Sequence, residues 1–147
     1  MQKLLRMQTT QASKYKLNVT LDEIDRQLCY KSFYHFVKIF WPYVVTENYI
    51  DNWHIKYICD TLQIVGKRIA ARQPHLGDVI INVPPGSSKT TIVTIMFPVW
   101  VWVLDAKIRT LTASYSAGLS IDHAVKSRDI IKSDKFRALF PDVAIRK

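Results

Sequence analysis

The stretch that most constrains the fold is residues 77–91, Gly-Asp-Val-Ile-Ile-Asn-Val-Pro-Pro-Gly-Ser-Ser-Lys-Thr-Thr. A β-branched apolar run, a loop of small residues, a lysine and a hydroxyl residue follow one another in it. This order is typical of a buried strand, a phosphate-binding loop and the start of a helix. Backbone N–H groups at a helix N-terminus attract an anion, and Lys89 adds a positive charge there. The Thr90 hydroxyl would be placed to reach a magnesium ion on the phosphates.

The loop departs from the general pattern G-x-x-x-x-G-K-[ST]. Counting back from Lys89, the two glycine positions hold Val83 and Ser88, and Gly86 and the neighbouring serines supply the small residues instead. As a bare pattern the match is weak. The β-branched run before the loop and the long apolar segment after it are what favour a phosphate site.

Around this loop the sequence predicts an α/β fold. Val79 to Val83 is expected to be a central strand covered on both faces, residues 108–114 a second strand, and residues 90–104 the helix between them. The β-branched residues at 90–95 favour a strand by propensity, but the length of the segment and the preceding loop favour a helix buried all round. Strand, loop, helix and strand form a βαβ unit. Further helices are expected over residues 117–132 and 134–139.

Two helices are expected before the unit. Thr20 and Glu23 fit a capping box, and apolar residues at helical spacing continue from there until Pro42 ends the helix. A second helix is expected over residues 51–72. Its apolar face is expected to consist of Trp53, Tyr57, Ile58, Leu62, Val65 and Ile69. Aromatic residues gather in and between these helices, either as core packing or as a platform for stacked bases: Phe33, Phe36, Phe40, Trp41, Tyr43, Tyr49 and Trp53.

The formal net charge of +9 is concentrated at the two ends of the chain. Residues 1–19, expected to be a flexible arm, carry four basic residues and no acidic one, and residues 126–147 carry seven basic against three acidic. Such ends are expected either to contact nucleic-acid phosphates or to be solvated. Cys29 and Cys59 are expected to be buried, reduced thiols of a cytosolic protein. The apolar run 92–104 is too short to span a bilayer, which needs ~20 residues.

The order of motifs resembles the amino-terminal ATPase region of bacteriophage terminase large subunits, the motors that package DNA into proheads. The resemblance covers about residues 33–142. It rests on five features in order: Phe40-Trp41-Pro42, Trp53-His54, Val83-Pro84-Pro85-Gly86-Ser87-Ser88-Lys89-Thr90, Phe97-Pro98-x-Trp100, and Ala113-Ser114-Tyr115-Ser116 followed by Leu139-Phe140-Pro141. The double proline before the loop and the Ser-Tyr-Ser after a predicted strand make the set fairly specific.

The resemblance implies an incomplete P-loop NTPase-type domain over residues 20–147 that binds ATP and Mg²⁺. Lys89 would contact the β- and γ-phosphates, Thr90 would be the metal ligand, and Trp53 and His54 would lie near adenine. The implied partners are double-stranded DNA, the portal and the small terminase subunit. A homo-oligomeric ring, no membrane, and action at the prohead in the host cytoplasm are also implied. The whole nucleotide-binding set comprises Pro85, Gly86, Ser87, Ser88, Lys89, Thr90 and Thr91.

Hydrolysis needs an acidic residue at the end of an apolar strand to hold magnesium. The one matching run ends at Asp105, inside the segment expected to be the helix after the loop, so it does not fit. In the family the acidic strand and a nuclease domain lie downstream of the matched region. The chain is therefore expected to be a truncated or split terminase, and an ATPase only when completed by missing segments. A non-catalytic nucleic-acid or assembly module and a fragment of another P-loop motor, such as a helicase, remain as alternatives.

Overall fold

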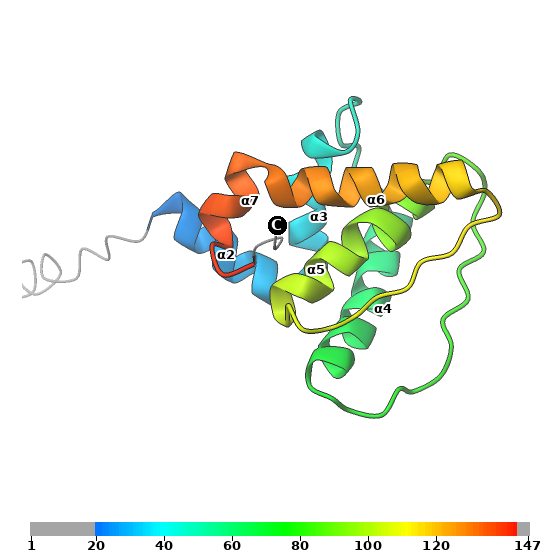
Figure 1. The fold of residues 1–147 in the computed structure, drawn as a ribbon, viewed down its shortest axis with the longest axis horizontal. Helices are drawn as coiled ribbons and strands as arrows, with labels where there is room; N and C mark the ends of the chain where they lie inside the picture. Colours follow the sequence, from blue (N-terminus) through cyan, green and yellow to red (C-terminus); the bar gives the residue numbers. More distant parts are fainter. Residues whose placement is uncertain (1–19, 144–147) are drawn as a thin grey trace, which may run out of the picture.

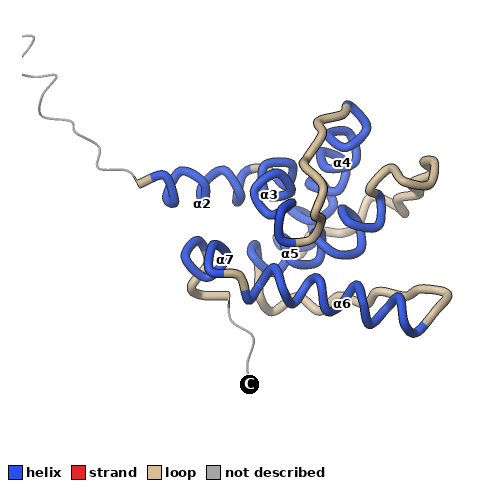
Figure 2. The backbone as a smooth tube through the Cα atoms, turned by 90° about the horizontal axis from the view of Figure 1, so that it is seen from above, coloured by secondary structure: helices blue, strands red, loops and turns tan. Residues whose placement is uncertain are grey.

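The structure, a computed structural model, describes residues 20–143, which contain helices and no strand (Figures 1 and 2). The predicted arm, residues 1–19, lies outside this part of the chain. None of the helices in residues 20–143 has the combination of length and apolar composition that crossing a bilayer requires. In chain order the helices are α2 (Leu21–Lys31), α3 (Phe33–Phe40), the 3₁₀ helix η1 (Trp41–Tyr43), α4 (Trp53–Ala70), the π-helix η2 (Thr91–Met96), α5 (Phe97–Leu104), α6 (Ala117–Lys132) and α7 (Asp134–Leu139).

The predicted α/β fold is wrong for residues 20–143, because neither predicted strand pairs with another backbone. Without the two strands there is no βαβ unit, and so no P-loop NTPase-type domain, in this part of the chain. Residues 79–83 and 108–114 have no assigned secondary structure and run as elongated loops beside the helices, as Figure 1 shows. Ile80 is 91% exposed and Leu111 is 97% exposed, where a sheet covered on both faces would have buried them. Their β-branched neighbours favour extended backbone, but a strand also needs a partner for its N–H and C=O groups.

Helix α5 lies at the centre of the molecule, between α4 on one side and α6 on the other (Figure 2). Its sequence is apolar on every face, and five of its eight residues are buried: Pro98, Val99, Trp100, Val101 and Val103. The prediction of a helix over residues 90–104 is confirmed, with the difference that its first part is π-helical. It is not buried all round, because Thr90 is exposed and Thr94 and Trp102 are half-buried. Pro98 lies in the first turn of α5, directly after the π-helix, so it removes one N–H donor from the ladder of a continuous helical run.

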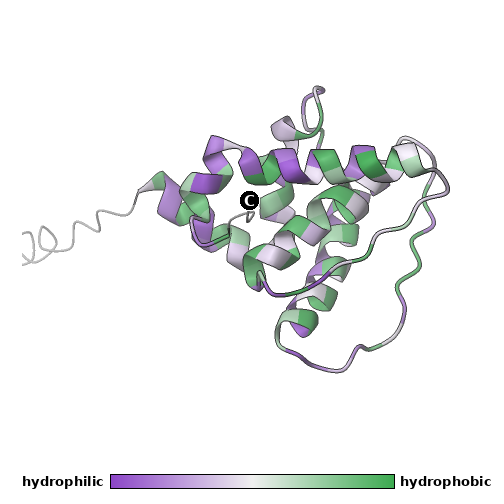
Figure 3. Cartoon of the chain, in the orientation of Figure 1, coloured by the Kyte–Doolittle hydropathy of each residue, from purple (hydrophilic) through white to green (hydrophobic). Residues whose placement is uncertain are grey.

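The remaining helices form two layers around α5. Helices α2, α3 and α4 lie on one side, and α6 and α7 on the other (Figure 2). Helix α7 packs against both α6 and α2, which joins the layers at one end. Buried hydrophobic residues from both layers form one core. Hydrophilic and hydrophobic residues alternate along α2 and α6 (Figure 3). The bounds predicted for α6 and α7 are confirmed.

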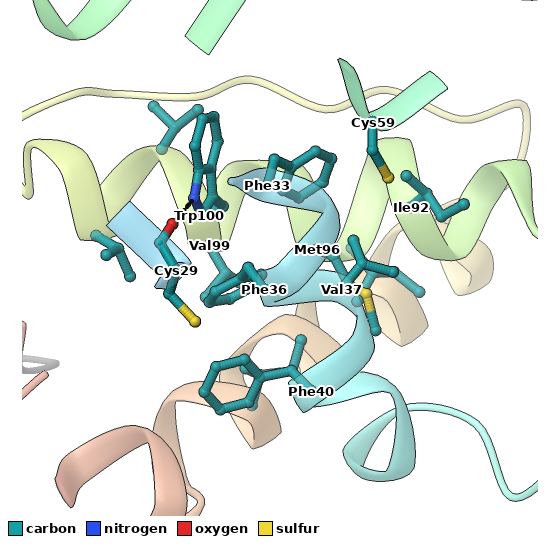
Figure 4. Packing of buried hydrophobic residues seen from close by; sticks show 14 of the residues in the cluster. Cys29, Phe33, Phe36, Val37, Phe40, Cys59, Ile92, Met96, Val99 and Trp100 are labelled. Carbon is teal, nitrogen blue, oxygen red and sulfur yellow. Dashed lines mark hydrogen bonds between the residues drawn. The ribbon is translucent and has the colours of Figure 1, made fainter. Parts of the chain in front are cut away.

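The first predicted helix begins as expected but is interrupted at Ser32. Thr20 and Glu23 form the predicted capping box, with hydrogen bonds of 3.2 Å in both directions. An unbroken helix would pair the N–H of Phe33 with the carbonyl of Cys29. Instead the Phe33 N–H donates to Oε1 of Gln63 in α4, at 2.8 Å, and the Cys29 carbonyl accepts from the indole of Trp100 in α5, at 2.8 Å (Figure 4). Side chains of two other helices thus satisfy the groups that the break sets free.

Helix α4 is shorter than predicted and turned differently about its axis. It begins after Asn52 and ends before Arg72, whose left-handed φ of 54° stops it. Of the predicted apolar face, Ile58 and Leu62 are buried, but Trp53 is 79% and Tyr57 69% exposed. The inward face instead consists of Ile55, Ile58, Cys59, Leu62 and Gly66. Within the aromatic set, Phe33, Phe36, Phe40 and Trp41 pack in the core, as predicted for core packing.

Candidate phosphate-binding loop

Residues 84–90 turn the chain sharply into the helix that leads to α5. Two of them have left-handed backbone, Gly86 with φ 80° and Ser88 with φ 58°. The turn is closed by Ser87, whose hydroxyl donates to the carbonyl of Pro84 at 2.7 Å. Glycine adopts a left-handed φ at little cost, whereas Ser88 does so against the steric preference of an L-residue. The loop is therefore held in a conformation that its neighbours must support.

The end of this loop is the N-terminus of a helix. Helical backbone begins at Lys89, and the first helical hydrogen bond runs from the N–H of Ile92 to the carbonyl of Ser88, at 3.1 Å. The N–H groups of Lys89, Thr90 and Thr91 precede that bond and so have no partner in the helical ladder. From Thr91 onward the helix is π-type, a form that often marks functional sites. The backbone here presents unused donors at the positive end of a helix dipole.

The side chains around the helix start add one uncompensated positive charge. Lys89 is half-buried, and no carboxylate of residues 20–143 lies within ion-pair distance of its ammonium group. Thr90 is exposed, and Thr91 is half-buried at the start of the π-helix. Of the predicted nucleotide-binding residues, the seven from Pro85 to Thr91 thus form one continuous turn and helix start. These seven residues are consecutive in the sequence and so must lie together. The left-handed backbone of Ser88 was not predicted from the sequence.

Helix α4 holds the loop through His54. The Nε2 atom of His54 lies 3.3 Å from the carbonyl of Ser87. A carbonyl oxygen can only accept, so this contact requires the proton to be on Nε2. The sequence placed His54 near adenine, but here it contacts the loop backbone, and this contact helps keep the loop in its strained conformation. No local signal in the sequence pairs His54 with Ser87, because the two are 33 residues apart.

A cleft opens beside the loop, between the start of α4 and the extended residues 79–83. Its volume is about 340 Å³. Trp53 and Tyr57 line it with rings that are 79% and 69% exposed, and the Trp53 ring meets the His54 ring edge-on at 6.1 Å. Exposed aromatic rings on a rigid helix are suited to stacking against a planar, apolar group. The cleft and the loop share His54, so the two features form one continuous surface.

Acidic groups that could hold a metal are not grouped at the loop. Among residues 20–143, no three His, Cys, Asp or Glu side chains cluster as metal ligands would. Asp105 follows the C-terminal end of α5, at the opposite end of the helical run that starts at Lys89. It accepts from Arg72 at 2.7 Å and so ties the ends of α4 and α5 together. The sequence argument against Asp105 as the magnesium ligand therefore agrees with its position.

Two arginines that could bind phosphate by their charge do not belong to the loop. Arg109 is exposed on the extended segment after α5. Arg128, on α6, pairs with Asp129 at 3.5 Å. Neither contacts residues 84–91 through a hydrogen bond or ion pair of the described chain. The candidate site is thus limited to the loop, the first turn after it and the His54 end of α4.

A comparison of the chain with protein-family models, with curated proteins and with solved structures finds no match. The function must therefore be inferred from the residues and their geometry.

Proposed function

We propose that residues 85–91 bind the phosphate groups of a nucleotide, with ATP and Mg²⁺ as the expected ligands. One observation carries the proposal. The left-handed Gly86 and Ser88 turn the chain so that a helix starts at Lys89. The ammonium group of Lys89 has no carboxylate partner in residues 20–143. Unpaired N–H groups and a free ammonium at one point are the donors that phosphate oxygens take. This binding mode needs only the loop and the helix start and does not depend on a sheet.

Each residue of the site has a defined task in this proposal. The Lys89 ammonium contacts the terminal phosphates, and the backbone of Gly86, Ser87 and Ser88 curves around them. The exposed Thr90 hydroxyl is available to a magnesium ion that is also held by phosphate oxygens and water. The cleft next to the loop accepts the base, where Trp53 offers a face for stacking. His54 positions the loop through the Ser87 carbonyl.

The wider role that we propose is the nucleotide-binding part of a viral DNA-packaging motor of the terminase type. The five ordered motifs support it, and so does the position of the lysine at the helix start. Double-stranded DNA, a portal and a small terminase subunit are the partners expected of such a motor. The described residues hold no acidic cluster at the loop, so binding rather than hydrolysis is proposed for this chain. The same observation favours a non-catalytic nucleic-acid module as the second candidate.

The test is a calorimetric titration of the chain with ATP and Mg²⁺. Lys89→Ala is compared with Lys107→Ala, which removes an exposed lysine at the turn after α5. The proposal predicts micromolar binding that weakens at least tenfold, about 1.4 kcal/mol, in Lys89→Ala only. Equal losses in both variants, or no binding below millimolar ATP, would overturn it.

A second titration, with duplex DNA over a range of salt concentrations, separates the two candidate roles. A motor part binds both ATP and DNA, whereas the nucleic-acid module binds DNA and no ATP. Affinity for DNA that falls steeply with salt reports phosphate contacts by basic side chains. Loss of DNA binding in Lys89→Ala would show that the loop itself contacts nucleic acid, which would count against the nucleotide site.

A further inference from the structure

Two extended segments of the structure, residues 78–83 and 109–114, have backbone groups without partners in the described chain. No backbone hydrogen bond joins either segment to another part of residues 20–143. Both run along the same side of the helices, one before η2 and one after α5 (Figure 1). Extended backbone with free N–H and C=O groups is a template for pairing with another strand.

The side chains of residues 78–83 alternate as those of a half-covered strand do. Val79 is 42% exposed, and Ile81 is half-buried against the core. Ile80, between them, is 91% exposed. Asp78 and Asn82 are exposed with it at the period-2 positions. The outward face of this segment therefore presents Asp78, Ile80 and Asn82.

Residues 109–114 present a complementary set at the same spacing. Leu111 is 97% exposed, and Arg109 lies two positions before it, as Asp78 lies two positions before Ile80. Neither Asp78 nor Arg109 forms an ion pair with another side chain of residues 20–143. Parallel pairing of the two segments brings Asp78 beside Arg109 and Ile80 beside Leu111. An opposite-charge pair and an apolar pair then support each other on one face.

We infer that two copies of this chain associate by pairing residues 78–83 of each copy, in parallel, with residues 109–114 of the other. A two-fold axis along the strand direction makes the two pairings equivalent and closes the assembly at a dimer. The charge complementarity of the segments and their matched spacing select a second copy as the occupant. The pairing covers Ile80 and Leu111, which are the most exposed of the valine, isoleucine and leucine residues in the described part of the chain. It does not depend on nucleotide binding.

The first measurement is sedimentation velocity of the 147-residue chain over a wide concentration range, combined with infrared spectra of the amide band. The inference predicts a monomer–dimer equilibrium in which an extended-sheet signal grows in step with the dimer. A monomer at every concentration, an assembly larger than a dimer, or a dimer without sheet signal would overturn it.

Charge reversal tests the pairing register. Asp78→Arg and Arg109→Asp are each expected to raise the dimer dissociation constant at least tenfold, and the double variant is expected to restore it to within a few-fold. Both positions are exposed, and the helical circular dichroism of each variant should match that of the unmodified chain. Single variants without effect, or a double variant that is not rescued, would exclude this register.

A proline substitution tests the backbone part of the inference. Ile80→Pro removes an N–H donor from the centre of the first segment, and Ile80→Thr is the matched control that keeps it. The dimer is expected to be lost in Ile80→Pro and retained, with weaker association, in Ile80→Thr. Equal association of the two variants would show that the contact uses side chains alone, contrary to the inference.

Discussion

The indole N–H of Trp100 donates a 2.8 Å hydrogen bond to the carbonyl of Cys29, at the break between α2 and α3 (Figure 4). Trp100 is fully buried and comes from α5, 71 residues away in the sequence. The bond fixes the central helix to the point where the first helix changes direction. It therefore couples the break in one layer to the packing of the core.

Trp100→Phe should lower the free energy of unfolding by about 2–4 kcal/mol, because it removes buried ring atoms and leaves the Cys29 carbonyl without its donor. Trp102→Phe is the matched control. The Trp102 indole donates to the carbonyl of Ile108 at 3.0 Å, but its side chain is only half-buried. Urea unfolding followed by circular dichroism measures both. A Trp102→Phe loss as large as that of Trp100→Phe would contradict the assigned role of the Trp100–Cys29 bond.

Gly66→Ala should destabilise the protein by about 1–3 kcal/mol through overpacking. A Cβ atom on Gly66 would lie 2.6 Å from Cζ3 of Trp100, a buried ring that has no space to move into. The contrasting variant is Gly118→Ala in the first turn of α6, where the nearest atom is Oγ of Ser116 at 3.7 Å. There the better helix propensity of alanine should prevail, with a gain of up to about 1 kcal/mol. Melting temperatures that move in the same direction would argue against the close α4–α5 contact.

Cys29 and Cys59 should react slowly with thiol reagents in the folded protein. Both are buried and unpaired, as predicted, and burial raises the pKa of each thiol to about 12. The reactive thiolate is therefore scarce near neutral pH, and the sulfur is also shielded. Labelling by a disulfide reagent should be slow in buffer and rapid in urea. Rapid labelling in buffer would mean that α2 or α4 opens far more readily than its packing implies.

Acid should weaken the contact between α7 and α2. Lys135 of α7 donates to Asp25 at 2.9 Å and to Asp22 at 2.8 Å. The Lys135 hydrogen bond is the main cause that lowers the pKa of Asp25, with His35 assisting. A carboxyl group whose pKa is lower in the folded state than in the unfolded chain stabilises the fold above the unfolded pKa, about 3.9. That stabilisation is lost as the pH falls through the folded pKa.

The measurement is urea unfolding of the unmodified chain and of Asp25→Asn between about pH 7 and about pH 2. The variant should be less stable by about 0.5–1 kcal/mol near neutral pH, because the pair is partly screened by solvent. The difference should shrink as the pH falls below the unfolded pKa of about 3.9, and it should vanish once the pH is below the lowered pKa of Asp25 in the folded chain. A difference that stays constant over this range would contradict the lowered pKa.

Features that depend on neighbouring residues could be predicted from the sequence. The capping box at Thr20 and Glu23, the bounds of α6 and α7 and the buried helix after the loop follow from local spacing and composition. The helix start after the loop belongs to this group, since it was predicted at Thr90 and lies one residue earlier, at Lys89. The break at Ser32 could not be predicted, because it depends on Gln63 and Trp100, whose side chains come from other helices.

The two strands were predicted from their β-branched composition. Such composition favours extended backbone, but a strand also needs a second segment to pair with. Val79 to Val83 is β-branched and extended, but pairing is a property of two segments and no partner approaches it within residues 20–143. Likewise, the spacing of Trp53 and Tyr57 with Ile58 suggested one apolar face, whereas the core takes the face of Ile55 and Cys59. At the site, sequence located the loop but could not predict the left-handed Ser88 or the contact of His54 with the Ser87 carbonyl.

The most direct test of the phosphate-binding loop is a residue-resolved NMR titration of the chain with ATP and Mg²⁺, repeated on Lys89→Ala. We predict that the largest amide shifts occur at Gly86, Ser87, Ser88 and Lys89, with smaller shifts at Trp53, and that Lys89→Ala abolishes them. Shifts confined to the basic ends of the chain, or unchanged in Lys89→Ala, would contradict the account.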